Sequence, residues 1–226
     1  MTTTAPGRVI AFTGGDGAGK STLATRLHQA LTDAGHDAIL VGKHSTHLPM
    51  DTELSAYLDQ LNHLVYRRDA AVAQACGDHY WLLALATWYT LQDRLVIQPA
   101  RRSGTHVVLD NSHHKILARY AVNPAVSRRL TEQVFAHLTE PDLVYFLDIG
   151  AREALARKGA FTSVESGHSG DSGEDFIRYQ DTVLAQIREH AGQNGVWLPL
   201  DVSGLDRDQV LKAALGALAD RLNLTV

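Results

Sequence analysis

Residues 14–22 read Gly-Gly-Asp-Gly-Ala-Gly-Lys-Ser-Thr and contain the spacing G-x-x-x-x-G-K-[ST], which is typical of a loop that binds the phosphates of a nucleoside triphosphate. Gly14, Gly15, Gly17 and Gly19 are expected to adopt positive φ, which lets successive backbone N–H groups turn toward one anion. Lys20 is placed to bring a positive charge to the β- and γ-phosphates, and the Ser21 hydroxyl is placed to bind Mg²⁺. The alternative, a glycine-rich turn that only caps a helix, does not account for the Lys-Ser pair. The residues predicted to bind the triphosphate are Gly14, Gly15, Gly17, Ala18, Gly19, Lys20, Ser21 and Thr22.

Two aspartates further along the chain end apolar runs that are typical of buried strands. Asp110 follows Val-Val-Leu, and Asp148 follows Tyr-Phe-Leu. A carboxylate at the end of a strand can hold Mg²⁺ or its waters, or accept a proton from a hydroxyl that is being phosphorylated. Asp110 is the stronger candidate because the polar residues 111–114 follow it. Asp148 is also placed to cap a helix that begins near Ala151.

Twelve histidines raise the question of a metal site. His44 and His47 are close in sequence and His113 and His114 are adjacent, but neither pair has the Cys or Glu partners of known zinc motifs. Structural zinc is therefore not expected. We expect His44, His47 and His113 to donate hydrogen bonds to an acceptor molecule, with ordinary surface histidines as the alternative. The single cysteine, Cys76, is expected to serve packing.

These residues need a scaffold that places them at one edge. The apolar run 8–13 precedes the phosphate loop, and leucines at helical spacing follow it, so the order is strand, loop, helix. Pro99 is expected to stop a long helix. Five strands separated by helices predict an α/β fold, a five-stranded parallel sheet with helices on both faces and the site at the carboxyl ends of the strands. The other predicted strands are 37–42, 105–110, 143–148 and 196–200, and the other predicted helices are 54–65, 70–98, 125–138, 151–158, 175–190 and 206–222.

Residues 159–174 hold four glycines and four serines without an apolar period, which predicts a mobile segment. The plain interpretation is a solvated connector, and the functional one is a lid that closes over phosphates and excludes water. Its position between two predicted helices favours the lid. Because the segment contains no Arg or Lys, Arg157 or Lys158 at its base is expected to neutralise phosphate charge.

The composition fits a single soluble domain that spans residues 1–226, with 45% hydrophobic residues and a net charge of −4. Without a basic excess, binding to nucleic acid is not expected. No apolar run is long enough to span a bilayer, so a membrane partner is not expected either. The first residues lack a basic stretch followed by an apolar one, which favours a cytoplasmic location.

The run Ile10–Thr22 resembles the phosphate loop of thymidylate kinases, including the carboxylate embedded in it, here Asp16. The resemblance continues in order along nearly the whole chain. It implies a P-loop fold of the nucleoside monophosphate kinase type, with ATP and Mg²⁺ as cofactors and a small-molecule acceptor. It also implies that Asp16 contacts an acceptor hydroxyl and that Ser21 and Asp110 hold the metal. A homodimer is a possible assembly. The other matching segments are 41–44, 107–112, 141–157 and 200–204.

The departures from the family concern the acceptor. The resemblance places Asn111 and Tyr89 where thymidylate kinases grip the acceptor's phosphate with arginines, and Lys43 replaces a third arginine. At roughly 1.5–3 kcal/mol for each lost charge-assisted hydrogen bond, two losses weaken phosphate binding by about a hundredfold or more. The predicted acceptor-binding residues are Lys43, His44, Tyr89, Asn111 and His113, and the predicted catalytic residues are Lys20, Asp16, Asp110 and Arg157.

The expected function is therefore ATP-dependent transfer of the γ-phosphate to a nucleoside, a modified nucleotide or another hydroxyl-bearing metabolite. One alternative is a genuine thymidylate (dTMP) kinase, in which cations elsewhere replace the missing arginines. The other is a nucleotide-dependent switch with slow hydrolysis.

Overall fold

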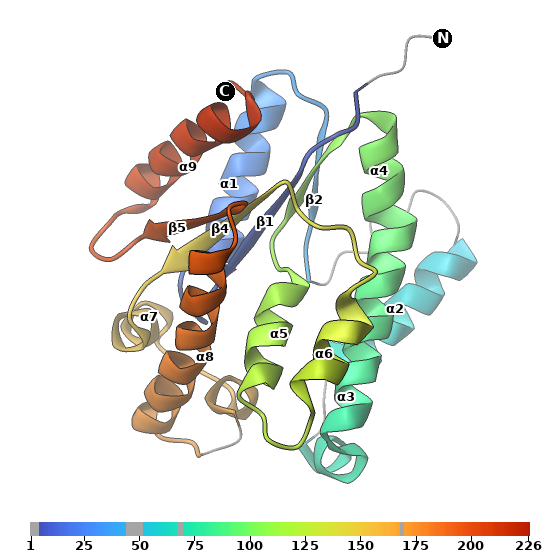
Figure 1. Ribbon diagram of the computed structural model, residues 1–226, viewed down its shortest axis with the longest axis vertical. Coiled ribbons are helices and arrows are strands. Elements are labelled where there is room, and N and C mark those ends of the chain that lie inside the picture. Colours follow the sequence, from blue (N-terminus) through green and yellow to red (C-terminus); the bar gives the residue numbers. More distant parts are fainter. Residues whose placement is uncertain (1–4, 44–51, 67–69, 168–169) are drawn as a thin grey trace.

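The computed structural model describes residues 5–43, 52–66, 70–167 and 170–226. Within these residues the chain forms one parallel sheet in the order β2-β3-β1-β4-β5, with β1 between β3 and β4 (Figure 1). The predicted α/β fold with a five-stranded parallel sheet is confirmed. The strands are β1 (Val9–Gly14), β2 (Ala38–Val41), β3 (His106–Leu109), β4 (Leu143–Asp148) and β5 (Trp197–Asp201).

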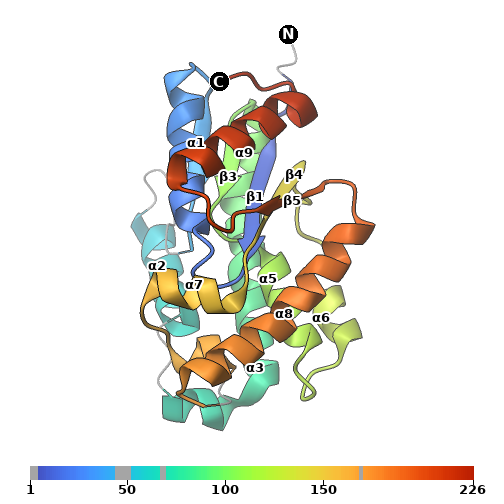
Figure 2. The same cartoon turned by 90° about the vertical axis from the view of Figure 1, so that its left-hand side faces the viewer.

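Helices cover both faces of the sheet. Helices α1 and α9 lie together on one face, and α4, α5 and α8 cover the other (Figures 1 and 2). Helices α2, α3 and α6 pack with α5 into a third cluster beside the sheet. None of the helices in the described ranges is both long and apolar enough to cross a membrane. The helices are α1 (Lys20–Asp33), α2 (Thr52–Tyr66), α3 (Ala70–Gln92), α4 (Gln98–Ser103), α5 (His113–Ala121), α6 (Arg128–Phe135), α7 (Ala151–Lys158), α8 (Gly173–Gln193) and α9 (Arg207–Leu222), with a π turn η1 (Asp93–Ile97) and a 3₁₀ turn η2 (Ser163–Ser166).

The central strands are buried on both sides, as expected for a parallel sheet covered by helices. Ile10 and Phe12 of β1 face the cluster formed with α1 and α9. Val9 and Ala11 face the cluster formed with α5 and α8. Because both faces of β1 are apolar, its sequence is a continuous hydrophobic run. This run is the pattern that predicts the strand.

The long helix differs from the prediction at both ends. Pro99 does not stop it: the chain continues from α3 through the π turn η1 into α4, and Pro99 lies in the first turn of α4. The missing N–H of proline is tolerated where a helix begins, and the wider π turn immediately before it separates the two hydrogen-bonding patterns. The break lies instead at Gly77, whose φ of 71° and ψ of 170° are not helical.

Helix α5 is not predicted by the sequence patterns. It begins after Ser112, which has an extended backbone with φ of −119° and ψ of 160°. Its buried positions include His113, His114 and Lys115, so its inner face is not an apolar stripe. A search for hydrophobic periodicity therefore misses a short helix whose buried face carries chemistry.

Candidate functional site

The phosphate loop joins β1 to α1 at the carboxyl edge of the sheet. Gly14, Gly17 and Gly19 have φ of 137°, 93° and 91°, so these three glycines adopt the conformation that the prediction requires. Gly15 does not, and the expectation of positive φ is wrong there. A Cβ at position 17 would lie 2.3 Å from the carbonyl oxygen of Ala154, so the loop packs directly against helix α7.

The loop presents the amino end of α1 to the site. The first turn of α1, which the structure describes in full, contains no acidic side chain, so the positive end of the helix dipole is left for an anion. The ammonium of Lys20 is folded back onto the loop and donates to the carbonyl oxygens of Gly14, at 3.1 Å, and Gly15, at 2.6 Å. Burial lowers the pKa of Lys20. The loop can thus offer both N–H groups and a buried cation to a polyphosphate.

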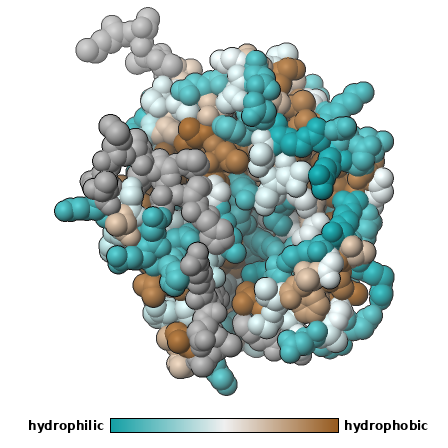
Figure 3. Space-filling model, turned by 180° about the vertical axis from the view of Figure 1, so that it is seen from behind, coloured by the Kyte–Doolittle hydropathy of each residue, from teal (hydrophilic) through white to brown (hydrophobic). Residues whose placement is uncertain are grey.

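A cavity of about 2260 Å³ runs along this edge, between the loop, α5, η2 and the start of α9. The back face of the molecule is hollowed near its centre, where hydrophilic side chains lie (Figure 3). Most residues predicted for the site line this one cavity, which places donor and acceptor candidates together. They are Asp16, Gly17, Ala18, Gly19, Lys20, Ser21, Thr22, Lys43, Asp110, Asn111 and Arg157.

Two cations that the sequence patterns did not identify converge on Asp16. Lys115 donates to its Oδ1, and the Arg119 guanidinium donates to its Oδ2 at 2.8 Å. Lys115 and Arg119 are four residues apart on α5 and therefore point from one face of the helix. Their side chains are only 8% and 18% exposed, so both charges lie within the wall of the cavity.

The electrostatics of this cluster favour binding of an anion. Burial alone would raise the pKa of Asp16, but the charges of Lys115 and Arg119 outweigh it and hold that pKa well below its usual value. Burial lowers the pKa of Lys115, and the nearby charge of Lys20 lowers it further. The charges of Lys115, Arg119 and Lys20 therefore all act on the single Asp16 carboxylate, an excess of positive charge that a phosphate group would relieve.

Gln180 of α8 connects the phosphate loop with the segment predicted to be a lid. Its side chain is 1% exposed. Its Oε1 accepts from the backbone N–H of Asp16 at 3.1 Å, and its Nε2 donates to Asp16 Oδ2, at 3.1 Å, and to the carbonyl of Glu165, at 2.7 Å. One amide thus holds the carboxylate in the loop and touches the lid segment.

The lid segment is less irregular than the sequence suggests, because it contains the turn η2. The Glu165 carboxylate accepts from Lys158 at 2.5 Å and from the backbone N–H of Thr162 at 2.8 Å. Burial would raise the pKa of Glu165, but the hydrogen bonds from Lys158 and Thr162 keep it below its usual value. Closure over a substrate remains a prediction for this segment.

The two positions where the family resemblance expects arginines lie side by side. Asn111 donates from Nδ2 to the hydroxyl of Tyr89 at 3.1 Å. Burial raises the pKa of Tyr89 to about 12, so this pair is uncharged. Tyr89 does not line the large cavity, although Asn111 does. This contact leaves a neutral group at each of the two positions.

The histidines predicted for the acceptor are not gathered at this wall. His113 is 6% exposed and stacks on Phe135 with ring centroids 5.7 Å apart, and it does not line the large cavity. His44 and His47 lie outside the described residues. Lys43 does line the cavity, with its ammonium 4.6 Å from the centre of the Tyr66 ring.

The two strand-ending aspartates have different surroundings. Asp110 lines the cavity. Asp148 forms a bidentate ion pair with Arg188 of α8, with 2.6 Å between its Oδ1 and Nη2. The residue that caps α7 is Gly150, so the expectation that Asp148 serves as this cap is wrong. Asp148 instead ties β4 to α8.

Arg157 lies at the base of the lid segment, as predicted. Its guanidinium donates to Glu153, at 2.7 Å, and to the carbonyl of Val202, at 2.9 Å. The side chain is thus tied to the chain that follows β5 and borders the cavity. Its role in neutralising phosphate charge remains a prediction.

Sequence reasoning missed Lys115, Arg119 and Gln180. The first two carry a usable signal, since two cations at helical spacing directly follow a strand that ends in Asp110. Gln180 carries none, because a single glutamine in an amphipathic helix is ordinarily solvated.

Comparison with known proteins gives consistent matches to one family. The family model for thymidylate kinase matches residues 12–193. A thymidylate kinase of Dinoroseobacter shibae is 30% identical over 194 residues, covering 84% of this chain and 86% of the relative. One from Xanthomonas oryzae is 31% identical over 222 residues, covering 96% and 87%.

A solved structure of Candida albicans thymidylate kinase has a TM-score of 0.68 and 20% identity, and the match covers 96% of this chain and 93% of that one. This likeness confirms the fold, and the family match confirms the resemblance and the prediction of an enzyme. The chain belongs to the thymidylate kinase family of ATP-dependent kinases.

Proposed function

We propose that this enzyme transfers the γ-phosphate of ATP to dTMP, and that Lys115 and Arg119 hold the acceptor's phosphate. The observation that carries the proposal is the convergence of these two cations on Asp16 in the wall of the cavity. The thymidylate kinases of Dinoroseobacter shibae and Xanthomonas oryzae match this chain over most of their length, and they support the same acceptor. This was the alternative in the sequence interpretation, and the rebuilt acceptor site has less support.

The binding free energy lost at two neutral positions is similar to the binding free energy that two cations on α5 can supply. Two neutral groups at Asn111 and Tyr89 remove about 1.5–3 kcal/mol each from phosphate binding. Lys115 and Arg119 offer two charge-assisted donors from the neighbouring helix α5, and a hydrogen bond to a charged group contributes a similar amount. In this proposal the acceptor's phosphate is held by two cations of α5, and both of them line the cavity.

The donor half follows from the phosphate loop. Loop N–H groups and the amino end of α1 cradle the triphosphate, and Lys20 turns from the carbonyls of Gly14 and Gly15 to the phosphates. Ser21 and Asp110 supply oxygen ligands suited to Mg²⁺, which neutralises phosphate charge when bound. Catalysis then rests on positioning and charge neutralisation.

Asp16 has a double role in this proposal. Without substrate it is the counter-ion of Lys115 and Arg119, which keeps the two cations oriented. With substrate it contacts an acceptor hydroxyl, while the two cations turn toward the phosphate. Arg157, at the base of the lid segment, adds positive charge as the segment closes. A homodimer and a cytoplasmic location remain predictions.

A second candidate acceptor is a nucleoside or another molecule without a phosphate. The neutral hydrogen bond between Asn111 and Tyr89 favours it, because an uncharged pair suits a hydroxyl or a base better than a phosphate. The Candida albicans relative has broad substrate specificity, as reported with its structure. No observation favours the third alternative, a slow nucleotide-dependent switch.

ADP release measured over a panel of acceptors tests the proposal. The panel contains dTMP, thymidine, other nucleoside monophosphates and unrelated metabolites. Turnover of dTMP with kcat/KM of roughly 10⁴ M⁻¹s⁻¹ or more supports the proposed function. Preference for thymidine with little turnover of dTMP supports the second candidate. ADP release at a rate that no acceptor raises supports the nucleotide-dependent switch.

A further inference from the structure

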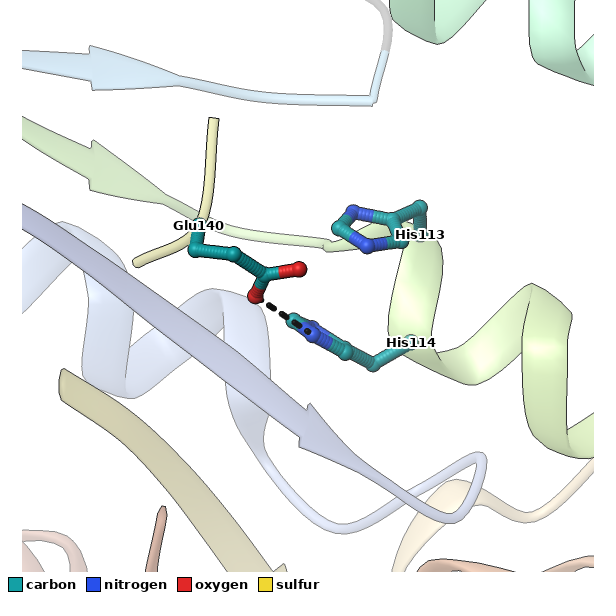
Figure 4. Close-up of side chains that lie close together, drawn as sticks. All are labelled: His113, His114 and Glu140. Carbon is teal, nitrogen blue, oxygen red and sulfur yellow. Dashed lines mark ion pairs between the residues drawn. The ribbon is translucent and has the colours of Figure 1, made fainter. Parts of the chain in front are cut away.

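A cluster of metal-binding side chains lies outside the cavity, where the start of α5 meets the turn before β4. It consists of His113, His114 and Glu140 (Figure 4). One ligand atom from each residue lies within 4.8 Å of the others. The two imidazoles extend from α5 toward the Glu140 carboxylate (Figure 4). None of the three lines the large cavity.

We propose that His113, His114 and Glu140 bind a Zn²⁺ ion. Two ligands of a tetrahedral zinc ion, each about 2.0–2.2 Å from the metal, lie roughly 3.3 Å apart. The Nε2 atom of His114 lies 3.7 Å from Oε2 of Glu140. This separation is too long for a good direct hydrogen bond, and it is close to the spacing of two ligands that share one ion.

The histidines are prepared for a metal. Nδ1 of His114 lies 3.1 Å from the hydroxyl of Ser112, so a proton on Nδ1 leaves the lone pair of Nε2 directed at the carboxylate. Such a hydrogen bond on the second nitrogen is usual in zinc ligands. The ring of His113 is buried beside that of His114, with the two ring centroids 4.2 Å apart, so both imidazoles lie near the same carboxylate.

The donor set selects the metal. Two imidazole nitrogens and one carboxylate suit Zn²⁺, whereas Mg²⁺ prefers oxygen ligands and keeps its waters. Three protein ligands leave a fourth position for water. Glu140 has a side chain that is 70% exposed, so an ion reaches the cluster from solvent although His114 is only 5% exposed.

The bound ion would have a structural consequence for the kinase site. It would fasten the first turn of α5 to the segment that leads into β4. Lys115 is the next residue of α5, so the ion would restrict the backbone that carries this cation. The proposal does not depend on which acceptor the enzyme uses.

Zinc titration of the full-length, metal-free protein, in competition with a chromophoric chelator, tests the site. Wild type is compared with His114→Gln, Glu140→Gln and a control, His36→Gln. The control removes one histidine of another close pair, His36 and His106, whose rings are 5.7 Å apart and which lie elsewhere in the molecule. Each histidine variant therefore retains the same number of histidines.

We expect wild type and His36→Gln to bind one Zn²⁺ with equal affinity and to gain thermal stability from it. We expect His114→Gln and Glu140→Gln to bind at least about a hundredfold more weakly, since the loss even of an outer partner costs ten- to a hundredfold. Mg²⁺ should not compete. Zinc binding by Glu140→Gln as tight as by wild type overturns the proposal, as does the absence of stoichiometric binding by wild type. Because Glu140 is exposed, its variant decides the question even if His114→Gln fails to fold.

Discussion

The two sides of the cavity present different kinds of chemical group, backbone N–H groups on one side and side chains on the other. On the donor side, the phosphate loop offers backbone N–H groups whose directions are set by Gly14, Gly17 and Gly19. On the side that we propose for the acceptor, the groups are side chains from α5 and α8, namely Lys115, Arg119 and Gln180, arranged around Asp16. A site of backbone groups depends on the course of the chain, so few substitutions preserve it. A site of side chains can take its charges from a different helix without altering the fold.

On the proposed assignment, this difference would explain how the chain keeps the family's fold with neutral side chains at Asn111 and Tyr89. The cavity retains its positive charge because α5 supplies it. The comparison also predicts that substitutions on the two sides will have separable effects, as follows from the largest expected effect to the smallest.

Lys20→Ala should leave the fold intact and lower phosphoryl transfer at least about a thousandfold, because this cation serves the transferring phosphate. Steady-state kinetics with dTMP and ATP, with circular dichroism as the folding check, measure it. Near-normal turnover by the folded variant would mean that Lys20 does not serve the transferring phosphate and that the donor side is wrongly assigned.

Asp110→Asn should still bind ATP and turn over about a hundredfold more slowly, because Asp110 lines the cavity and is proposed to hold Mg²⁺. Asp148→Asn is the matched control. Asp148 ends β4, which is separated from β3 by β1, and its carboxylate pairs with Arg188, so this variant should have the milder effect on kcat. Equal losses in both variants would mean that Asp110 has no special place in the site.

Arg119→Ala should reduce kcat/KM for dTMP about ten- to a hundredfold and change the KM for ATP little, because the lost hydrogen bond is charge-assisted and belongs to the acceptor side. Arg129→Ala, at an exposed position on α6, is the control and should match wild type. A loss expressed equally in the KM of ATP and of dTMP contradicts the division of the cavity into two halves.

The lid segment should become resistant to proteolysis when both sides of the cavity are filled. A glutamate-specific protease can cut after Glu165 and Glu174, and we expect cleavage to slow several-fold with a non-hydrolysable ATP analogue and dTMP together. Fragment masses identify the cut positions. Unchanged cleavage at saturating ligands would make residues 159–174 a connector.

The smallest expected effect concerns the pH dependence of Glu165. Its pKa is lowered in the folded protein, so its contribution to stability is present above the ordinary glutamate pKa of about 4.3 and is lost as the pH falls through the lowered value. Urea unfolding of wild type and Glu165→Gln should differ by at most about 1 kcal/mol at pH 7, after solvent screening. The difference should shrink below pH 4, and a difference that grows in acid contradicts the assigned direction.

Local patterns were enough to predict the sheet, because each strand is a short apolar run and the glycine-rich loop fixes its own geometry. The bounds of α7 and β4 were predicted to the residue. The path through Pro99 was not, because a π turn depends on packing over many residues. The cations of α5 were missed for a related reason: Lys115 looks like a surface residue until tertiary structure buries it against Asp16.

Gln180 has one more consequence, which concerns ionic strength. A phosphate-bearing substrate approaches the cations of the cavity through solvent, and salt screens that attraction. The contacts of Gln180 with Asp16 and with the carbonyl of Glu165 form through an uncharged amide inside the protein, and screening acts on them much less. Raising the salt concentration should therefore weaken substrate binding well before it disturbs the connection between the phosphate loop and the lid segment.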